Sequence, residues 1–269
     1  MINIPKVATI TRIIQENYRT KTIEFDVSVD AVPGQFIMVW LPQFDEKPFS
    51  LVHDDPLTLM VTAVGPFSHL LHQRKLGDSV WIRGPFGRGF QWGPQQRSIA
   101  LVGGGYGVAP LYWLARQATG GASDVKLDNI VSIIGARHAK DILYSDRFST
   151  LYSAPFVNNR MIASRQDSKN LTVPAVQLHI TTEDGSRGVQ GQVTDILEPM
   201  LAHGDIDGIY ACGPDGMLAA IEELAVRYHV AGQLSWEAYM RCAVGICGAC
   251  EHYGQVLCMD GPVLSVNRS

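Results

Sequence analysis

Four of the five cysteines lie in the last 28 positions of the chain, in the order Cys242, Cys247, Cys250 and Cys258. Their spacing, C-x4-C-x2-C followed by a more distant cysteine, is typical of plant-type [2Fe–2S] ligation, in which four thiolates hold two irons. A structural zinc site is the alternative, but such sites favour two separated C-x2-C pairs and only one is present. Packing alone would not gather four thiols so closely, so the pattern predicts an iron–sulfur cluster.

The rest of the chain uses cysteine sparingly. None occurs in the first 211 residues, and Cys212 stands alone. A secreted disulfide scaffold would connect distant parts of the chain, so this clustering indicates cluster or metal ligation in a reducing compartment. Gly245 and Gly248 lie between the ligands, where glycine lets backbone N–H groups approach sulfur and influence the reduction potential.

A glycine-rich turn lies between a predicted strand at residues 98–102 and a predicted helix at residues 111–118. Its glycines, at 103–105 and 107, would let the backbone approach a pyrophosphate, and the helix N-terminus would supply N–H donors. Pro110 suits the first turn of that helix. The turn departs from G-x-G-x-x-G, and glycines also serve such turns for purely steric reasons, so this turn alone does not establish a nucleotide site.

Two further turns follow predicted strands. Thr182–Ser186 ends the strand at residues 177–182, and Cys212–Met217 ends the strand at residues 209–212. Strand C-terminal ends share one edge of a parallel sheet, where ligands bind at the switch point, so three glycine-containing turns would frame one crevice. Cys212 is then either a cofactor contact or a small buried hydrophobic residue.

The first 95 residues are predicted to be all-β, because short runs rich in β-branched and aromatic residues alternate with turn signals. Six short strands favour a small closed barrel, since closure removes exposed edges. The sequence Lys47-Pro48-Phe49-Ser50 places a cation, an aromatic ring and a hydroxyl close together, although alone it would be an ordinary entry into a strand. The predicted strands cover residues 7–14, 22–27, 35–41, 49–52, 57–64 and 79–83.

After residue 95 the pattern becomes an alternation of strands and helices, which is typical of a parallel α/β sheet. The polar run at residues 149–176 is predicted to be a surface insertion, with a partner-binding flap as the alternative. We expect three domains, at residues 1–95, 96–232 and 233–269. The additional elements are strands at residues 130–136, 177–182 and 209–212 and helices at residues 193–202 and 217–229.

Composition limits the possible classes. The chain has 269 residues, of which 46% are hydrophobic and 18% charged, with a net charge of −4. This balance argues against nucleic-acid binding and gives no polybasic signal for a membrane surface. No apolar run approaches the ~20 residues of a membrane span, and the N-terminus lacks a signal-peptide layout. A cytoplasmic protein is therefore expected.

Taken together, these motifs resemble the ferredoxin–NADP reductase superfamily, where a flavin barrel precedes a nicotinamide domain. They are most similar to its branch of dihydroorotate dehydrogenase electron-transfer subunits, and the resemblance covers nearly the whole chain in order. It implies a multi-domain β and α/β fold class: an N-terminal Greek-key β-barrel, a parallel α/β nucleotide-binding domain and a small C-terminal [2Fe–2S] module. FAD, a [2Fe–2S] cluster and NAD(H) as substrate would be the redox groups.

The resemblance also assigns residues. Phe49 would contact the isoalloxazine, Ser50 would sit near its reactive edge, and Lys47 would face the pyrophosphate. Met217 would end the segment that holds NAD(H) against the flavin. The full implied set is Lys47, Pro48, Phe49, Ser50, Val61, Thr62, Ala63, Phe67 and Ser68 for FAD, and Gly103, Gly104, Gly105, Gly107, Val108, Ala109, Pro110, Asp184, Cys212, Gly213, Pro214 and Met217 for NAD(H).

The sequence departs from the family pattern at three places. Lys47 replaces an arginine, which exchanges a bidentate fork for a point charge. Phe67 replaces a glycine of a Gly-Thr pair at the phosphates. Only seven residues separate Cys250 from Cys258, a spacing that also resembles the flavoprotein gamma subunit of sulfhydrogenases.

The resemblance implies electron transfer without acid–base chemistry, so no side chain is assigned a catalytic role. A flavin exchanges either a hydride or single electrons, and so would connect NAD(H) to the cluster. The implied partner is an FMN-containing catalytic subunit of the dihydroorotate dehydrogenase type. A stand-alone reductase, a zinc-stabilised module without enzymatic activity and a degenerate flavin site are the alternatives. Arg137 and Arg187 leave the choice between NAD and NADP open.

Overall fold

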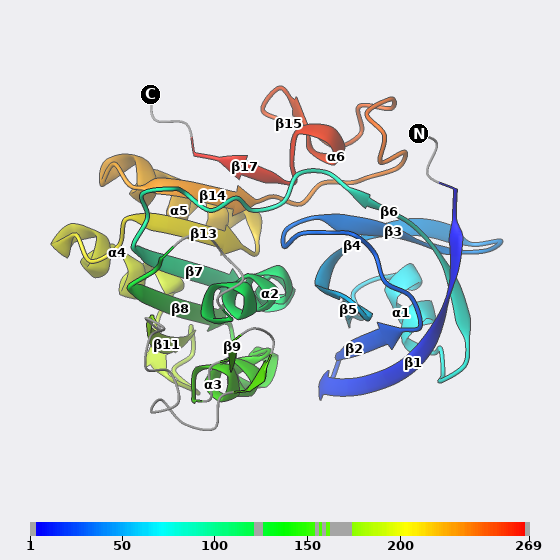
Figure 1. Ribbon diagram of the computed structural model, residues 1–269, viewed down its shortest axis with the longest axis horizontal. Coiled ribbons are helices and arrows are strands. Elements are labelled where there is room, and N and C mark those ends of the chain that lie inside the picture. Colours follow the sequence, from blue (N-terminus) through cyan, green and yellow to red (C-terminus); the bar gives the residue numbers. More distant parts are fainter. Residues whose placement is uncertain (1–3, 121–125, 154–155, 158–159, 162–173, 267–269) are drawn as a thin grey trace. The chain divides into compact units, whose positions relative to one another are not determined.

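The computed structural model describes residues 4–120, 126–153, 156–157, 160–161 and 174–266 (Figure 1). The chain forms two compact units. Unit 1 comprises Met1–Phe90 and Ser235–Leu264, and unit 2 comprises Gln91–Leu234 and Ser265–Ser269. The cysteine-containing tail therefore groups with the first ninety residues. That the tail forms a separate domain stays a prediction.

Unit 1 is built on a closed six-stranded antiparallel barrel, as predicted (Figure 1). The strand order is β1-β2-β5-β4-β3-β6. Strands β3, β4 and β5 are consecutive neighbours and β6 returns beside β3, which is the order of a Greek key. The strands are β1 (Lys6–Asn17), β2 (Thr20–Phe25), β3 (Phe36–Leu41), β4 (Asp45–Asp54), β5 (Leu57–Thr62) and β6 (Ser79–Phe86).

The barrel interior explains why these segments form strands. Phe25, Ile37 and Leu59 are fully buried, and all six residues of β5 are buried. Val, Ile and Phe side chains pack well against a pleated surface, and burying each contributes roughly 1.5–3 kcal/mol. Closure leaves no unpaired edge along the barrel.

A short helix that was not predicted from the sequence, α1 (Pro66–His72), follows β5. Gly65 is its N-cap and Pro66 occupies the first helical position, where a missing N–H costs nothing. The Ser68 hydroxyl accepts hydrogen bonds from the N–H groups of Val64 and Gly65, both at 3.0 Å. These contacts fix the turn that leads into the helix.

Unit 2 contains a sheet with the order β12-β11-β8-β7-β13-β14-β17. The pairs β12–β11, β11–β8, β8–β7 and β7–β13 are parallel, which confirms the predicted α/β class. At β17 the chain passes from unit 1 back into unit 2. The strands are β7 (Ser98–Gly104), β8 (Asn129–Ala136), β11 (Ala175–Thr182), β12 (Val189–Gln190), β13 (Gly208–Cys212), β14 (Ala231–Ser235) and β17 (Val263–Ser265).

Helices connect these strands, with α2 and α3 in front of the sheet and α4 and α5 behind it in Figure 1. From β7 the chain moves outward to β8 and β11, and it then returns to β13 on the other side of β7. The junction of β7 and β13 is therefore the topological switch point. The helices are α2 (Val108–Thr119), α3 (Ser145–Ser153), α4 (Val193–His203) and α5 (Asp215–Arg227), with 3-10 turns at Gly105–Gly107 and Ala139–Asp141.

The predicted polar insertion at residues 149–176 needs correction at both ends. Helix α3 extends to Ser153, because Phe148 and Leu151 pack into the core, and β11 begins at Ala175. A two-residue pair, β9 (Phe156–Val157) with β10 (Arg160–Met161), lies between them. Residues 154–155, 158–159 and 162–173 of this insertion lie outside the described part of the chain.

The tail of unit 1 carries few regular elements. It contains the two-stranded pair β15 (Glu251–His252) and β16 (Gln255–Val256), followed by α6 (Leu257–Asp260). The Arg88 N–H donates to the Gly261 carbonyl, and a Cβ on Gly87 would overlap that same carbonyl. Close backbone approach therefore fastens the tail to the segment that follows β6. Within the described residues, no helix is long and apolar enough to cross a membrane.

Candidate functional site

The four clustered cysteines lie in the tail of unit 1, and all are free thiols. Cys250 and Cys258 are almost completely buried, whereas Cys247 is exposed. The loop that carries the first three is tightly coiled, because Ala243, Gly245 and Gly248 have φ values of 59°, 76° and 68°. The two glycines thus adopt the left-handed conformation that glycine favours, in agreement with the tight loop expected from the sequence.

The coiled loop directs peptide N–H groups at the sulfur atoms. The N–H of Val244 lies 3.4 Å from Cys242 Sγ, and the N–H of Gly245 lies 3.3 Å from Cys258 Sγ. The N–H of Cys258 lies 3.4 Å from Cys250 Sγ. Such donors stabilise thiolate sulfur over neutral sulfur. The loop is therefore shaped to hold anionic sulfur.

The cysteines influence one another electrostatically: Cys242 interacts with Cys247, and Cys258 interacts with both Cys250 and Cys242. Burial acts to raise the pKa of the Cys242 thiol, but hydrogen bonds from the loop amides and from Cys247 outweigh it and lower the pKa to about 6. Burial and the Cys250 thiol raise the pKa of Cys258 to about 12. Among the described residues, no group of three or more histidine, cysteine or acidic side chains could hold a metal ion.

The predicted FAD residues lie on β4, on β5 and just after it at Ala63, and at the start of α1, all in unit 1. The ring of Phe49 lies 6.0 Å from that of Phe67, whose side chain is buried. Val61 and Thr62 are buried, and the Thr62 hydroxyl lies 3.0 Å from that of Thr20. Phe49 and Ser50 are half-buried, so the middle of β4 is the accessible part of this set.

Lys47 and Ser68 already have partners within unit 1. The Lys47 ammonium lies 2.6 Å from the Asp45 carboxylate and 5.0 Å from the ring centre of Tyr239 in the tail. The Ser68 hydroxyl is engaged by the turn before α1. The α1 start nevertheless presents first-turn amides, which have no partner within the helix itself and suit an anion. The binding of FAD phosphates there stays a prediction.

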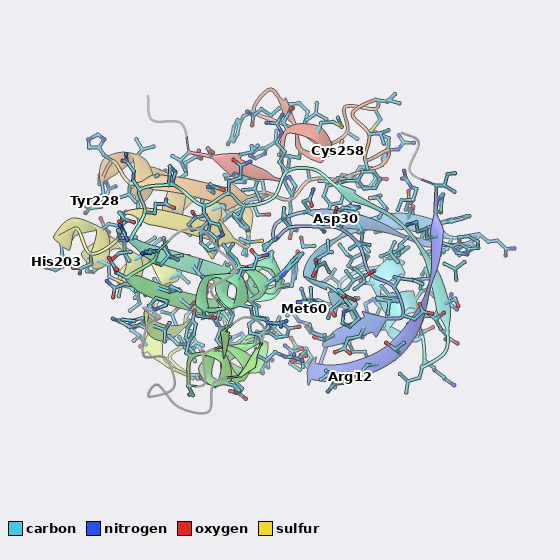
Figure 2. The ribbon with its side chains drawn as sticks, viewed as in Figure 1. Arg12, Asp30, Met60, His203, Tyr228 and Cys258 are labelled. Carbon is cyan, nitrogen blue, oxygen red and sulfur yellow. The ribbon has the colours of Figure 1, made fainter. Side chains whose placement is uncertain are left out.

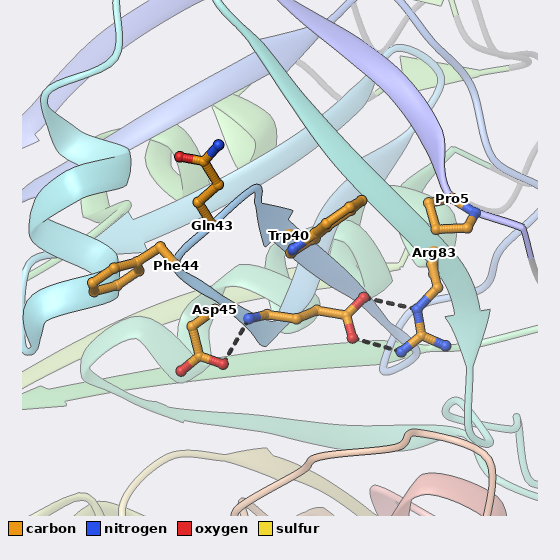
Figure 3. A pocket seen from close by; sticks show the side chains of 7 residues that line it. Pro5, Trp40, Gln43, Phe44, Asp45 and Arg83 are labelled. Atoms are coloured by element: carbon orange, nitrogen blue, oxygen red, sulfur yellow. Dashed lines mark hydrogen bonds and ion pairs between the residues drawn. The ribbon is translucent and has the colours of Figure 1, made fainter.

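An open cavity of about 570 Å³ lies on the outside of the barrel (Figure 3). Its lining includes Asp45 and Glu46, immediately before Lys47, but none of the predicted FAD residues. The cavity is therefore distinct from the predicted flavin site. Its lining residues are Pro5, Trp40, Gln43, Phe44, Asp45, Glu46 and Arg83.

In unit 2 the glycine turn and the turn after β13 pack backbone to backbone. Cys212 is the parallel partner of Gly103 in the sheet. A Cβ on Gly107 would overlap the Cys212 carbonyl and lie 2.7 Å from the Gly213 nitrogen. A Cβ on Gly104 would lie 2.8 Å from the Met217 sulfur. The structure thus brings both predicted turns together at the switch point and leaves no room for side chains between them.

Helix α2 begins in this turn. Val108, Ala109 and Pro110 are buried in its first turn, which confirms the placement of Pro110 predicted from the sequence. Pro214 is the N-cap of α5, so two helix N-termini lie beside each other at one sheet edge. Aligned N–H groups at helix starts favour a pyrophosphate.

Asp184 follows β11 at the same sheet edge. One of its carboxylate oxygens accepts hydrogen bonds from the Ser186 N–H (3.0 Å) and hydroxyl (2.6 Å), and the other lies 2.9 Å from His138 Nδ1. The hydrogen bonds from Ser186, and then that of His138, hold the pKa of Asp184 far below its usual value. Arg187 reaches Asp146 at 3.4 Å. The Asp184 carboxylate is therefore held in place beside the C-terminal end of β11, near one end of the row of strand ends.

Sequence reasoning did not identify Gly65, Arg83, His138 or Tyr239 as site residues, and it named Ser186 only as part of the turn after β11. The Gly-Pro pair at residues 65–66 is a helix-start signal that could have revealed α1. Ser186 and His138 come from turns 48 positions apart, and nothing local in the sequence links them. Only the sheet order brings those turns together.

The sequence of this chain is similar to those of known proteins. Residues 101–223 match the family described as "Oxidoreductase NAD-binding domain". A protein of Thermococcus kodakarensis is 38% identical over 258 residues, covering 96% of this chain and 95% of its own length. A protein of Methanocaldococcus jannaschii is 33% identical, covering 96% and 89%. Both carry the name "Probable dihydroorotate dehydrogenase B (NAD(+)), electron transfer subunit".

Solved structures share the fold. An NADH-dependent reduced ferredoxin–NADP oxidoreductase, studied for flavin-based electron bifurcation, matches with a TM-score of 0.74 and 24% identity. The match covers 99% of this chain and 90% of that one. A ferredoxin NADP+ reductase from Neisseria gonorrhoeae with bound FAD and NADP has a TM-score of 0.62, 14% identity and coverage of 83% and 91%. A β-barrel combined with an α/β sheet is thus the ferredoxin reductase fold.

Proposed function

The chain belongs to the family of dihydroorotate dehydrogenase B electron transfer subunits, and from that premise we propose that it is an oxidoreductase subunit carrying FAD and a [2Fe–2S] cluster. Electrons pass through it between NAD(H) and a partner catalytic chain. The observation that carries the proposal is the coiled cysteine loop, around which peptide N–H groups face the sulfur atoms of Cys242, Cys250 and Cys258.

The C-x4-C-x2-C spacing followed by Cys258 favours two irons over one zinc. A [2Fe–2S] cluster takes two thiolates at each iron, whereas a structural zinc ion takes all four around one centre. Cys242 and Cys247 would serve one iron, and Cys250 and Cys258 the other.

The chemistry that the bound groups supply is electron conversion: NAD(H) exchanges a hydride, the cluster exchanges single electrons, and FAD exchanges both. The protein binds and orients these groups. In unit 2, the glycine turn and the starts of α2 and α5 hold the pyrophosphate, and Asp184 accepts hydrogen bonds from the adenosine ribose. In unit 1, Phe49 packs against the flavin ring and the α1 start holds its phosphates.

The partner is an FMN-containing catalytic subunit that oxidises dihydroorotate to orotate, while this chain reduces NAD+. The test is coexpression with a candidate catalytic chain, purification of the complex, and assay of dihydroorotate-dependent NAD+ reduction. We expect activity only when both chains are present. Activity of this chain alone towards a diffusible ferredoxin, with no stable complex, would instead identify a stand-alone reductase.

Asp184 is expected to select NAD(H) over NADP(H). Its fixed negative charge accepts hydrogen bonds from a ribose diol and repels a 2′-phosphate. In Asp184→Asn, the ratio of kcat/KM for NADH to that for NADPH should fall about tenfold. Steady-state dye reduction with each nucleotide measures this ratio.

The matched control for this prediction is Glu183→Gln, which removes the neighbouring charge from the same turn. Its ratio should stay close to that of the wild type, because the Ser186 and His138 contacts fix Asp184 and not Glu183. An unchanged ratio in Asp184→Asn would mean that this carboxylate does not face the ribose.

A further inference from the structure

Arg83 of β6 joins the barrel to the cysteine loop. Its guanidinium donates two hydrogen bonds to the Glu46 carboxylate on β4, at 2.7 and 2.6 Å (Figure 3). One of the same nitrogens also lies 3.4 Å from the carbonyl oxygen of Cys242, the first cysteine of the loop. The ring of Phe86 lies 5.4 Å from the guanidinium carbon.

This cation is well shielded from water. The Arg83 and Glu46 side chains are only 17% and 21% exposed, so solvent screens their charges less than it screens those of exposed ion pairs. Bidentate geometry orients the guanidinium and fixes the direction of its remaining N–H groups. Arg83 therefore holds the Cys242 carbonyl from a rigid strand.

A second contact ties the same region of β4 to the tail. Lys47, one position after Glu46, places its ammonium over the ring of Tyr239, three residues before Cys242. The strand that carries the predicted flavin residues thus contributes to both contacts with the cysteine loop. Motion of this loop relative to β4 is limited at two points, both within unit 1.

We propose that Arg83 is a positioning residue for the cluster, fixing the loop of its first ligand against the barrel and raising its reduction potential. This inference rests on the proposed function. Reduction adds a negative charge to the cluster, and a nearby cation stabilises that charge. Glu46 acts in the opposite sense, because its carboxylate offsets the charge of Arg83 while holding it in place.

The experiment is a redox titration of the anaerobically purified full-length protein, followed by the electron paramagnetic resonance signal of the reduced cluster. At the midpoint potential of the wild type, Arg83→Leu should lower the ratio of reduced to oxidised cluster about tenfold, a shift of about 59 mV. Glu46→Gln should raise that ratio. Arg83→Lys keeps the charge, so its potential should stay near the wild-type value while a chelator removes its iron faster.

Arg12→Leu is the matched control, because it removes the same charge from the same barrel. Arg12 pairs with Glu24 at 3.3 Å and is 63% exposed. Figure 2 shows Arg12 far from Cys258, at the opposite side of unit 1. Its titration should overlay that of the wild type.

The opposite shifts expected for Arg83→Leu and Glu46→Gln distinguish an effect of charge on the midpoint potential from an effect of loosening the cysteine loop. If Arg83 had a merely structural role, Arg83→Leu and Glu46→Gln would shift the midpoint potential in the same direction. That result would overturn the proposal. So would unchanged potentials in both variants at wild-type iron content. If Arg83→Leu fails to retain iron, Glu46→Gln decides, because an unshifted potential there contradicts the inference. Wild-type protein that lacks iron altogether would defeat both the proposed function and this inference.

Discussion

Cys250→Ser is expected to eliminate the iron–sulfur cluster and to reduce electron delivery to the partner chain more than about 100-fold, since changes merely adjacent to metal ligands already cost 10–100-fold. Cys250 is 2% exposed, and its sulfur accepts the N–H of Cys258. A serine there offers no thiolate to the second iron. Iron content, acid-labile sulfide and the visible spectrum measure the loss.

The Cys250→Ser variant also distinguishes reduction of the flavin by NADH from electron transfer through the cluster. Reduction of flavin by NADH takes place without the cluster, so two-electron dye reduction should continue near the wild-type rate. Cys212→Ser is the matched control, because it makes the same substitution outside the cluster and should retain full iron content. Normal iron content in Cys250→Ser would show that this thiol is not a ligand. Stoichiometric zinc in colourless wild-type protein would establish the zinc alternative.

Gly107→Ala is expected to have the largest effect in unit 2. The added methyl group would overlap the Cys212 carbonyl and crowd the Gly213 nitrogen, both of them backbone atoms that cannot rotate away. Overpacking of this kind costs about 1–3 kcal/mol in the free energy of unfolding. It also separates the two turns at the switch point, so we expect KM for NADH to rise at least about tenfold.

Denaturant unfolding and steady-state NADH kinetics measure these two effects. Gly216→Ala is the control: it lies in the first turn of α5, and a Cβ there would meet no atom within 4 Å. That variant should keep wild-type NADH kinetics and lose no stability, because alanine is a better helix former than glycine. If Gly107→Ala bound NADH normally, the close approach of the two turns would not be required for the nucleotide site.

Much of the fold was predictable because local patterns agree with the final structure. The six barrel strands and the parallel sheet follow from β-branched runs bounded by turns, and residues of those runs form much of the core. Helix α1 was missed because seven residues between two strands give too short a period to detect. Helix α3 was missed because only Phe148 and Leu151 carry its apolar side within a polar run.

The candidate site, like the fold, was predictable where its signals are local and not where they depend on distant contacts. Cysteine spacing and the three turns are local signals, and the sheet order brings the turns to one edge as expected. Pairwise contacts at long range were not predictable: Arg83 and Cys242 are 159 positions apart. The role of Lys47 was assigned from the family pattern, whereas its contact with Tyr239 depends on the tail folding beside β4. That assignment stays a prediction.

Anaerobic purification of the full chain, followed by stepwise addition of NADH, tests the central claim most directly. We predict a protein that contains FAD together with about two irons and two sulfides per chain. NADH should bleach the flavin absorbance and then produce the paramagnetic signal of a reduced [2Fe–2S] cluster. A correctly folded protein that stays colourless, with neither iron nor flavin, would contradict the claim.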